Sequence, residues 1–139
     1  MSQHILLAYD GMPQSHTAAE WVAETFPEAS VTILTVLDPM EGFLDTFGYG
    51  TQQYDRWRTE AEAEAQTVLD TAAAVFNGDV ETVTRSGQVP RAIVNFATEA
   101  EVDHIVVGSH GRTGVSRVLL GSVAETVVRR SPTTVSVVR

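Results

Sequence analysis

The sequence predicts an α/β fold, a doubly wound sandwich, and the alternation of two hydrophobic patterns is the main reason. Short β-branched runs alternate with segments in which apolar residues recur every three or four positions. Several of the short runs are almost entirely apolar, as in parallel strands covered on both faces. The order β-α-β-α-β-α-β-α-β then requires right-handed crossovers between parallel strands. We expect one five-stranded parallel sheet of the Rossmann-like or flavodoxin-like type, in the order 3-2-1-4-5, with helices on both faces.

Each expected element follows from one of these patterns. The strands are predicted at 5–9, 31–37, 80–84, 104–107 and 133–138. The run 80–84 alternates apolar and polar residues, so we place it at an edge of the sheet. Helical spacing is found at 19–26, 57–76, 93–100 and 123–128. The segment 38–55 between them has no regular pattern and is long enough to act as a lid or binding loop.

Length and composition indicate one domain covering residues 1–139. A chain of 139 residues can bury a sizeable core, and the absence of cysteine excludes disulfides and thiolate metal sites. Residues 1–4 carry no Lys or Arg, and the apolar run after them stops at Asp10. No signal peptide or membrane-spanning helix is therefore expected, which predicts a cytoplasmic protein with no membrane partner.

The charge balance makes a nucleic acid an unexpected partner. Nine basic residues against eighteen acidic ones give a net charge of −9, whereas nucleic-acid binding depends on a basic surface. All nine basic residues are Arg, which fits either adaptation to high salt, as in halophilic proteins, or drift in base composition. From Gly108 onward a single acid, Glu125, accompanies five arginines. This basic carboxyl-terminal stretch can hold a small anion.

The segment from Gly108 to Ser122 is the most distinctive in the chain. It leaves a predicted strand, passes through a glycine-rich loop and enters a predicted helix at Ser122. Glycines let successive N–H groups approach one anion, and a helix N-terminus adds further donors, so the segment fits a phosphate site. The alternative is purely structural, since Ser122 and Glu125 also fit a capping box in which Ser122 caps the helix.

These residues resemble the universal stress protein family, in its ATP-binding subgroup. Gly108-x-x-Gly111, nine residues and then Gly121-Ser122 is similar to the family's Gly-2x-Gly-9x-Gly-Ser/Thr signature. Similarity also extends to residues 5–11, to Gly87-x-x-Pro90 and to residues 132–138. The sequence departs from the family pattern at Met12, where a small hydroxyl residue is common, and at Thr35, where His is frequent.

The resemblance implies an ATP site, or a site for another adenine nucleotide. Asp10 would lie by the adenosine, the backbone of Val36 would address adenine, and the glycine-rich segment would follow the ribose and phosphates. The implied binding residues are Ala8, Tyr9, Asp10, Val36, Gly108, His110, Gly111, Arg112, Gly121, Ser122 and Val123. Mg²⁺ or Mn²⁺ can arrive with the nucleotide, but no cluster of His, Asp and Glu predicts a metal site of the protein itself.

The expected function is that of a nucleotide-binding regulatory protein of the stress response. The resemblance also implies a homodimer formed through strand 133–138, which would expose an apolar edge if it were unpaired. No catalytic residue is predicted, because neighbours such as Ser109 and His110 seldom share a hydrogen bond in the geometry that catalysis needs. We expect His104, which precedes a strand, to face solvent. The alternatives are a nucleotide hydrolase or nucleotidyl transferase of related fold, and a nucleotide-free scaffold dimer.

Overall fold

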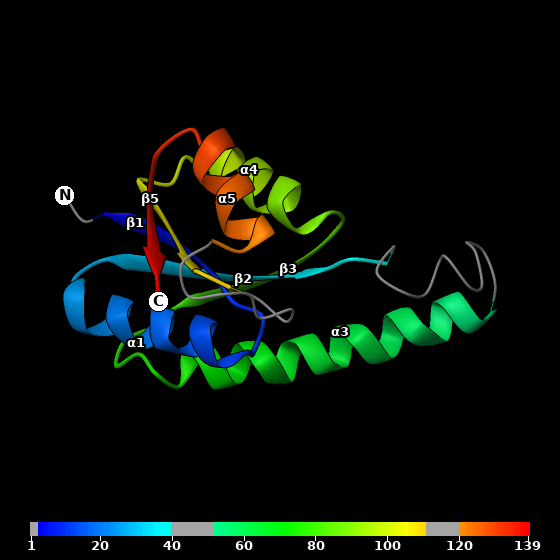
Figure 1. Cartoon of the computed structure of the whole chain (residues 1–139). Coiled ribbons are helices and arrows are strands. Elements are labelled where there is room, and N and C mark those ends of the chain that lie inside the picture. Colours follow the sequence, from blue (N-terminus) through cyan, green and yellow to red (C-terminus); the bar gives the residue numbers. More distant parts are fainter. Residues whose placement is uncertain (1–2, 40–51, 111–119) are drawn as a thin grey trace.

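The predicted sheet is confirmed in its strand number, direction and order. The computed structural model describes residues 3–39, 52–110 and 120–139. Its sheet has five parallel strands in the order β3-β2-β1-β4-β5 (Figure 1). The strands are β1 (His4–Ala8), β2 (Ser30–Leu37), β3 (Glu81–Ser86), β4 (His104–Gly108) and β5 (Thr134–Val138). The alternating strand β3 lies at one edge, as its pattern predicts, and β5 lies at the other.

In the described part of the chain, four helices cover the sheet, two on each face. They are α1 (Pro13–Thr25), α3 (Gln52–Ala73), α4 (Val89–Glu99) and α5 (Ser122–Arg130). Successive side chains of a strand point to opposite faces, so Ile5 and Leu7 pack in a cluster with α1 and α3, whereas Leu6 packs with α4 and α5. Figure 1 shows the same division into layers. The core therefore consists of two halves separated by the sheet.

The helix α3 differs from its expected bounds at both ends. It begins at Gln52, inside the segment expected to be irregular, and ends at Ala73 rather than at Phe76. Its first residues, 52–56, are mostly polar and show no apolar spacing, which is why the periodicity missed them. After Ala73 the turns become tighter, with the N–H groups of Val75 and Phe76 bonded to the carbonyls of Ala72 and Ala73, each at 3.1 Å. The rest of the expected loop, residues 40–51, lies outside the described residues.

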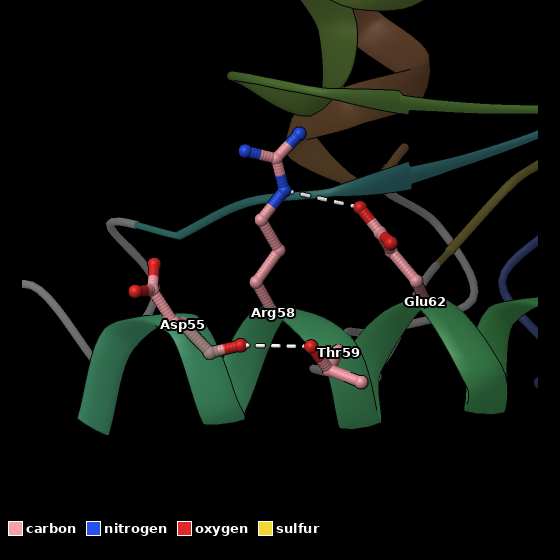
Figure 2. Close-up of polar contacts among 4 residues, drawn as sticks. All are labelled: Asp55, Arg58, Thr59 and Glu62. Atoms are coloured by element: carbon pink, nitrogen blue, oxygen red, sulfur yellow. Dashed lines mark hydrogen bonds and ion pairs between the residues drawn. The ribbon is translucent and has the colours of Figure 1, made fainter. Parts of the chain in front are cut away.

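Contacts within the helix itself support the first half of α3. Figure 2 shows Arg58 Nε donating to Glu62 Oε1 at 3.0 Å and Thr59 Oγ1 donating to the carbonyl of Asp55 at 3.0 Å. An exposed pair of this kind contributes only about 0.3–0.5 kcal/mol. The buried residues of α3 are Ala65, Leu69 and Ala72, all in its second half. Tertiary packing therefore holds α3 from Ala65 onward.

The structure gives no support to a membrane-spanning segment in the part of the chain that it covers. None of the helices among residues 3–39, 52–110 and 120–139 is both long enough and apolar enough to cross a bilayer.

Candidate functional site

The turn from β1 into α1 is organised by Asp10. Its Oδ1 accepts hydrogen bonds from the N–H of Met12 at 2.9 Å and from Ser15 Oγ at 2.8 Å. The chain reverses at Gly11, whose φ of +82° is strained for any residue with a side chain. One oxygen of the Asp10 carboxylate thus fixes the first turn of α1, at the carboxyl end of a central strand.

The predicted residue Tyr9 is buried in the half of the core that faces α1 and α3. Its hydroxyl lies 2.9 Å from His16 Nδ1, and its N–H donates to the carbonyl of Leu34 at 2.9 Å. Burial, assisted by the nearby Asp10 carboxylate, raises the pKa of the phenol above its ordinary value. The side chain of Tyr9 is therefore packed and hydrogen-bonded within the protein. Ala8 and Val36, by contrast, lie on the opposite face of the sheet, toward α4 and α5.

The end of β4 is joined to α1 by one side chain, Gln14. Its Oε1 accepts from Ser109 Oγ at 2.7 Å and from the N–H of His110 at 2.5 Å. Gly108 makes this contact possible, because a Cβ there would lie only 3.1 Å from the carbonyl carbon of Gln14. Gln14 is a site residue that the sequence did not predict. A pattern of apolar spacing carries no signal for a polar residue on the first turn of a helix.

The first turn of α1 therefore brings two groups of predicted residues together. Gln14 contacts the end of β4, and its neighbour Ser15 contacts Asp10 at the end of β1. The strands β1 and β4 are neighbours in the sheet. From β1 the chain continues to β2 and β3 on one side of β1, whereas β4 and β5 lie on its other side. The pair marks the point where the winding of the sheet reverses, and ligands of open α/β sheets bind at such points.

The N-terminus of α5 lies against the same place, but Ser122 does not cap it. Gly121 occupies the cap position and makes no side-chain bond, while Ser122 is the first residue of the helix. The capping-box interpretation is therefore wrong, and Glu125 forms an ion pair with Arg129 at 2.7 Å instead. The helix starts one residue earlier than that interpretation requires, and the N–H of its cap residue Gly121 donates to the carbonyl of Ser109 at 2.6 Å.

The bond between Gly121 and Ser109 also reduces the number of backbone N–H groups that can bind an anion. The N–H groups of His110 and Gly121 are bonded to the protein itself. Ser122 and Val123 follow Gly121 in the first turn of α5, where backbone N–H groups have no acceptor within the helix. The donors that α5 offers are therefore those of its first turn. The predicted residues Gly111 and Arg112 lie outside the described residues.

The prediction that Ser109 and His110 share no hydrogen bond of use to catalysis needs a partial correction. Their side chains do meet, with Ser109 Oγ 3.2 Å from His110 Nδ1. The hydroxyl hydrogen of Ser109 is directed to Gln14 Oε1 rather than to the imidazole, so the pair does not have the arrangement of a nucleophile and its base. The expectation for His104 is wrong. It is 7% exposed, and its Nε2 lies 2.7 Å from Ser136 Oγ.

A hollow of about 600 Å³ lies between α4 and α5. Asp38 at the end of β2, Gln88 before α4, and Arg91 and Arg130 contribute to its lining. Among the described residues that line it, Val123 is the one predicted site residue. Among the described residues, no group of three or more His, Asp or Glu side chains is placed to hold a metal ion.

The comparison with known families is decisive at this point. The family model described as the universal stress protein family matches residues 1–139. The chain belongs to the universal stress protein family. The resemblance stated from the glycine motif is thus confirmed.

Other universal stress proteins match along most of their length. A universal stress protein of Bacillus subtilis, YxiE, is 29% identical over 148 residues, covering 100% of both chains. Among solved structures, UspA from Lactobacillus plantarum has a TM-score of 0.73 and 25% identity, covering 99% of this chain and 97% of its own. A universal stress protein solved in complex with cAMP has a TM-score of 0.67 and 27% identity, with 99% and 97% covered. This universal stress protein therefore shares its α/β fold with proteins of known structure.

Proposed function

We propose that this protein binds an adenine nucleotide at the carboxyl ends of β1 and β4, with ATP as the first candidate. The observation that carries the proposal is a set of hydrogen bonds at the reversal point of the sheet. They hold Asp10, His110 and the start of α5 close together, through Ser15, Gln14 and Ser109. The universal stress protein that was solved with cAMP supports the same ligand class. Residues 1–139 act in this proposal as a single universal stress protein domain.

The predicted residues divide into a base end and a phosphate end. The backbone of Val36 and the Asp10 carboxylate would serve the adenosine, as the family resemblance implies. The first-turn amides of Ser122 and Val123 would meet the phosphates, helped by the positive end of the α5 dipole. Gly111 and Arg112 are assigned to the phosphates from the glycine motif alone. Mg²⁺ or Mn²⁺ would enter with a triphosphate, held mainly by its oxygens and by water.

The nucleotide serves regulation rather than turnover in this proposal. Phosphoryl transfer requires a positioned base or cation near the reacting phosphate, and the Ser109 hydroxyl is bonded to Gln14 instead of to a base. We expect slow ATP hydrolysis at most. Turnover of the purified protein with Mg²⁺ at about 1 per second or faster, in the range of ordinary enzymes, would refute this part of the proposal.

The protein is further proposed to form a homodimer through β5. This strand is an edge of the sheet, and its residues 135–138 are only half-buried in the single chain. An edge with apolar β-branched residues pairs readily with a second copy, by a twofold axis that gives both copies the same contact. Sedimentation or light scattering should give twice the mass of 15.1 kDa, and a monomer at micromolar concentration would refute the dimer. The cytoplasmic location stays a prediction.

Mass spectrometry of gently purified protein for co-purified nucleotide tests the central proposal. Calorimetric titration with AMP, ADP and ATP then gives the affinity and the preferred phosphate number. The variant Gly121→Val should lose binding, because a branched side chain would stand before the first turn of α5. Gly78→Ala is the control for a glycine replacement away from the site, since a Cβ at Gly78 meets no atom within 4 Å. Absence of any nucleotide and of any heat of binding in the wild-type protein would refute the proposal.

A further inference from the structure

The hollow between α4 and α5 is cationic, although the chain as a whole is acidic. Arg91 on α4 and Arg130 on α5 line it, and Asp38 at the end of β2 is the one acid among the described lining residues. Two arginines against one aspartate leave this lining with a charge of +1, whereas the whole chain carries −9. The hollow therefore attracts anionic groups, which the protein as a whole repels.

Neither of these two arginines is neutralised within the described part of the chain. Arg129, the neighbour of Arg130 on α5, pairs with Glu125. Arg91 and Arg130 are exposed and form no ion pair with a described residue. An arginine presents five N–H donors in a planar fork that matches a carboxylate. Both guanidinium groups are thus available to an anion from outside the domain.

The fold places Arg91 and Arg130 toward opposite ends of the hollow. Both α4 and α5 connect parallel strands on the same face of the sheet, so they run in the same direction (Figure 1). Arg91 lies in the first turn of α4, whereas Arg130 is the last residue of α5. At about 1.5 Å per residue, their positions differ by about 9–12 Å along the helices. This separation suits two carboxylates on one segment better than a single small anion.

The rest of the lining combines apolar and uncharged polar side chains. It is apolar at Val89, Pro90, Val94 and Val123 and polar at Gln88, Asn95 and Thr126. Docking surfaces for proteins commonly join an apolar patch to a polar rim, and arginine is enriched in them. Val123 also belongs to the proposed phosphate end of the nucleotide site, but Arg91 and Arg130 have no part in that site. The hollow therefore fits a segment that carries both carboxylates and an apolar side chain.

We propose that the hollow between α4 and α5 is a docking site for an acidic segment of a partner protein, with carboxylates that meet Arg91 and Arg130 and an apolar side chain that contacts the valines of the lining. A nucleic acid does not fit this description, because its binding requires a much more extensive basic surface. The proposal gives this protein a partner of defined chemistry. It does not depend on nucleotide binding.

A fluorescein-labelled peptide of about eight residues, rich in Glu and with two Leu, tests the proposal by fluorescence anisotropy in 0.15 M NaCl. The net charge of −9 opposes non-specific binding of such a peptide. We expect the peptide to bind, and its affinity to fall as NaCl is raised toward 1 M. Arg91→Ala and Arg130→Ala should each weaken binding by about two- to fivefold. Both arginines are exposed, so far-UV circular dichroism should show intact folding of these variants.

Arg129→Ala is the matched control for Arg130→Ala. It removes the same charge from the same helix, but Arg129 is not among the described residues that line the hollow. Its peptide affinity should stay within about 1.5-fold of wild type, because salt screens charges outside the contact. A peptide with Gln in place of each Glu should not bind. No binding of the Glu peptide at 1 mM, equal binding of the Gln peptide, or an equal loss in Arg129→Ala would overturn the proposal.

Two further measurements distinguish other occupants of the hollow. Calorimetric titration should give wild-type ATP affinity for Arg91→Ala and Arg130→Ala. If both variants lost ATP affinity and ATP displaced the peptide, the hollow would belong to the nucleotide site, and the docking proposal would be wrong while the proposed function stood. If the variant with both substitutions had a lower mass in solution than wild type, a second copy of the chain would occupy the hollow, which would also overturn the proposal.

Discussion

Replacing Gly108 with alanine tests how closely β4 and α1 must approach. A Cβ at this position would lie 3.1 Å from the carbonyl carbon of Gln14, 3.2 Å from its Cβ and 3.2 Å from the N of Ser15. Two of these three atoms belong to the backbone of α1, so no side-chain rotation relieves the contact. The helix must move away from the strand by a few tenths of an ångström or the strand end must bend.

The expected cost is that of overpacking a well-packed contact, about 1–3 kcal/mol of unfolding free energy. With a urea dependence of about 2 kcal/mol per molar, the midpoint of unfolding should fall by about 0.5–1.5 M at an unchanged slope. The same displacement would stretch the bonds from Gln14 to Ser109 and His110. Nucleotide binding should therefore weaken along with stability.

Gly78→Ala provides the control, because the added methyl group has open space around it. It should leave the urea midpoint unchanged or raise it, since alanine reduces the entropy of the unfolded chain. If Gly108→Ala were as stable as Gly78→Ala, the close approach of α1 to β4 would not be tight in solution. The account of how Gln14 positions His110 would then be wrong.

Three further predictions concern single contacts. Burial lowers the pKa of His104 below its ordinary 6.5, so between the two pKa values the unfolded state binds a proton that the folded state does not. The stability that depends on neutral His104 should be present above pH 6.5 and lost as pH falls through the lowered pKa. Urea unfolding of His104→Gln, measured across this pH range, should lack this pH-dependent loss. An identical pH dependence of stability in both proteins would contradict the assignment. Asp10→Ala should lower the unfolding free energy by about 1–2 kcal/mol, because the N–H of Met12 loses its acceptor; a thermal melt unchanged from wild type would contradict this. Arg129→Ala should change stability by less than about 0.5 kcal/mol, since its ion pair is largely exposed, and a larger loss in urea would show that the pair is coupled to other contacts.

Most of the sheet could be predicted from the sequence because strands buried on both faces have a composition of their own. The apolar runs around Leu6 and Val106 form central strands, and the alternating run near Val83 forms an edge, as expected. The positions of the strand ends then follow from topology. Because the carboxyl ends of β1 and β4 are neighbours, Asp10 and His110 lie at the same end of the sheet.

Side-chain hydrogen bonds are harder to predict, because they depend on distances between segments that are far apart in the chain. Gln14 and Ser109 are separated by 95 positions, and no local pattern links them. The position of Ser122 fits a helix cap by sequence, yet a backbone bond at Gly121 moves the cap by one residue. The prediction for His104 failed for a similar reason, since the ring of Phe26, 5.5 Å away between ring centres, helps to cover it.

The uneven packing of α3 has a consequence for its motions. The helix has no buried residue before Ala65, and Figure 1 shows its N-terminal half extending past the sheet. Backbone amides in that half should exchange with deuterium through local fraying, whereas those around Leu69 and Ala72 should exchange only when the domain opens more widely. The two halves of this continuous helix should therefore differ in how strongly their backbone amides are protected from exchange. The turn around Gln52 can unwind while the core stays intact.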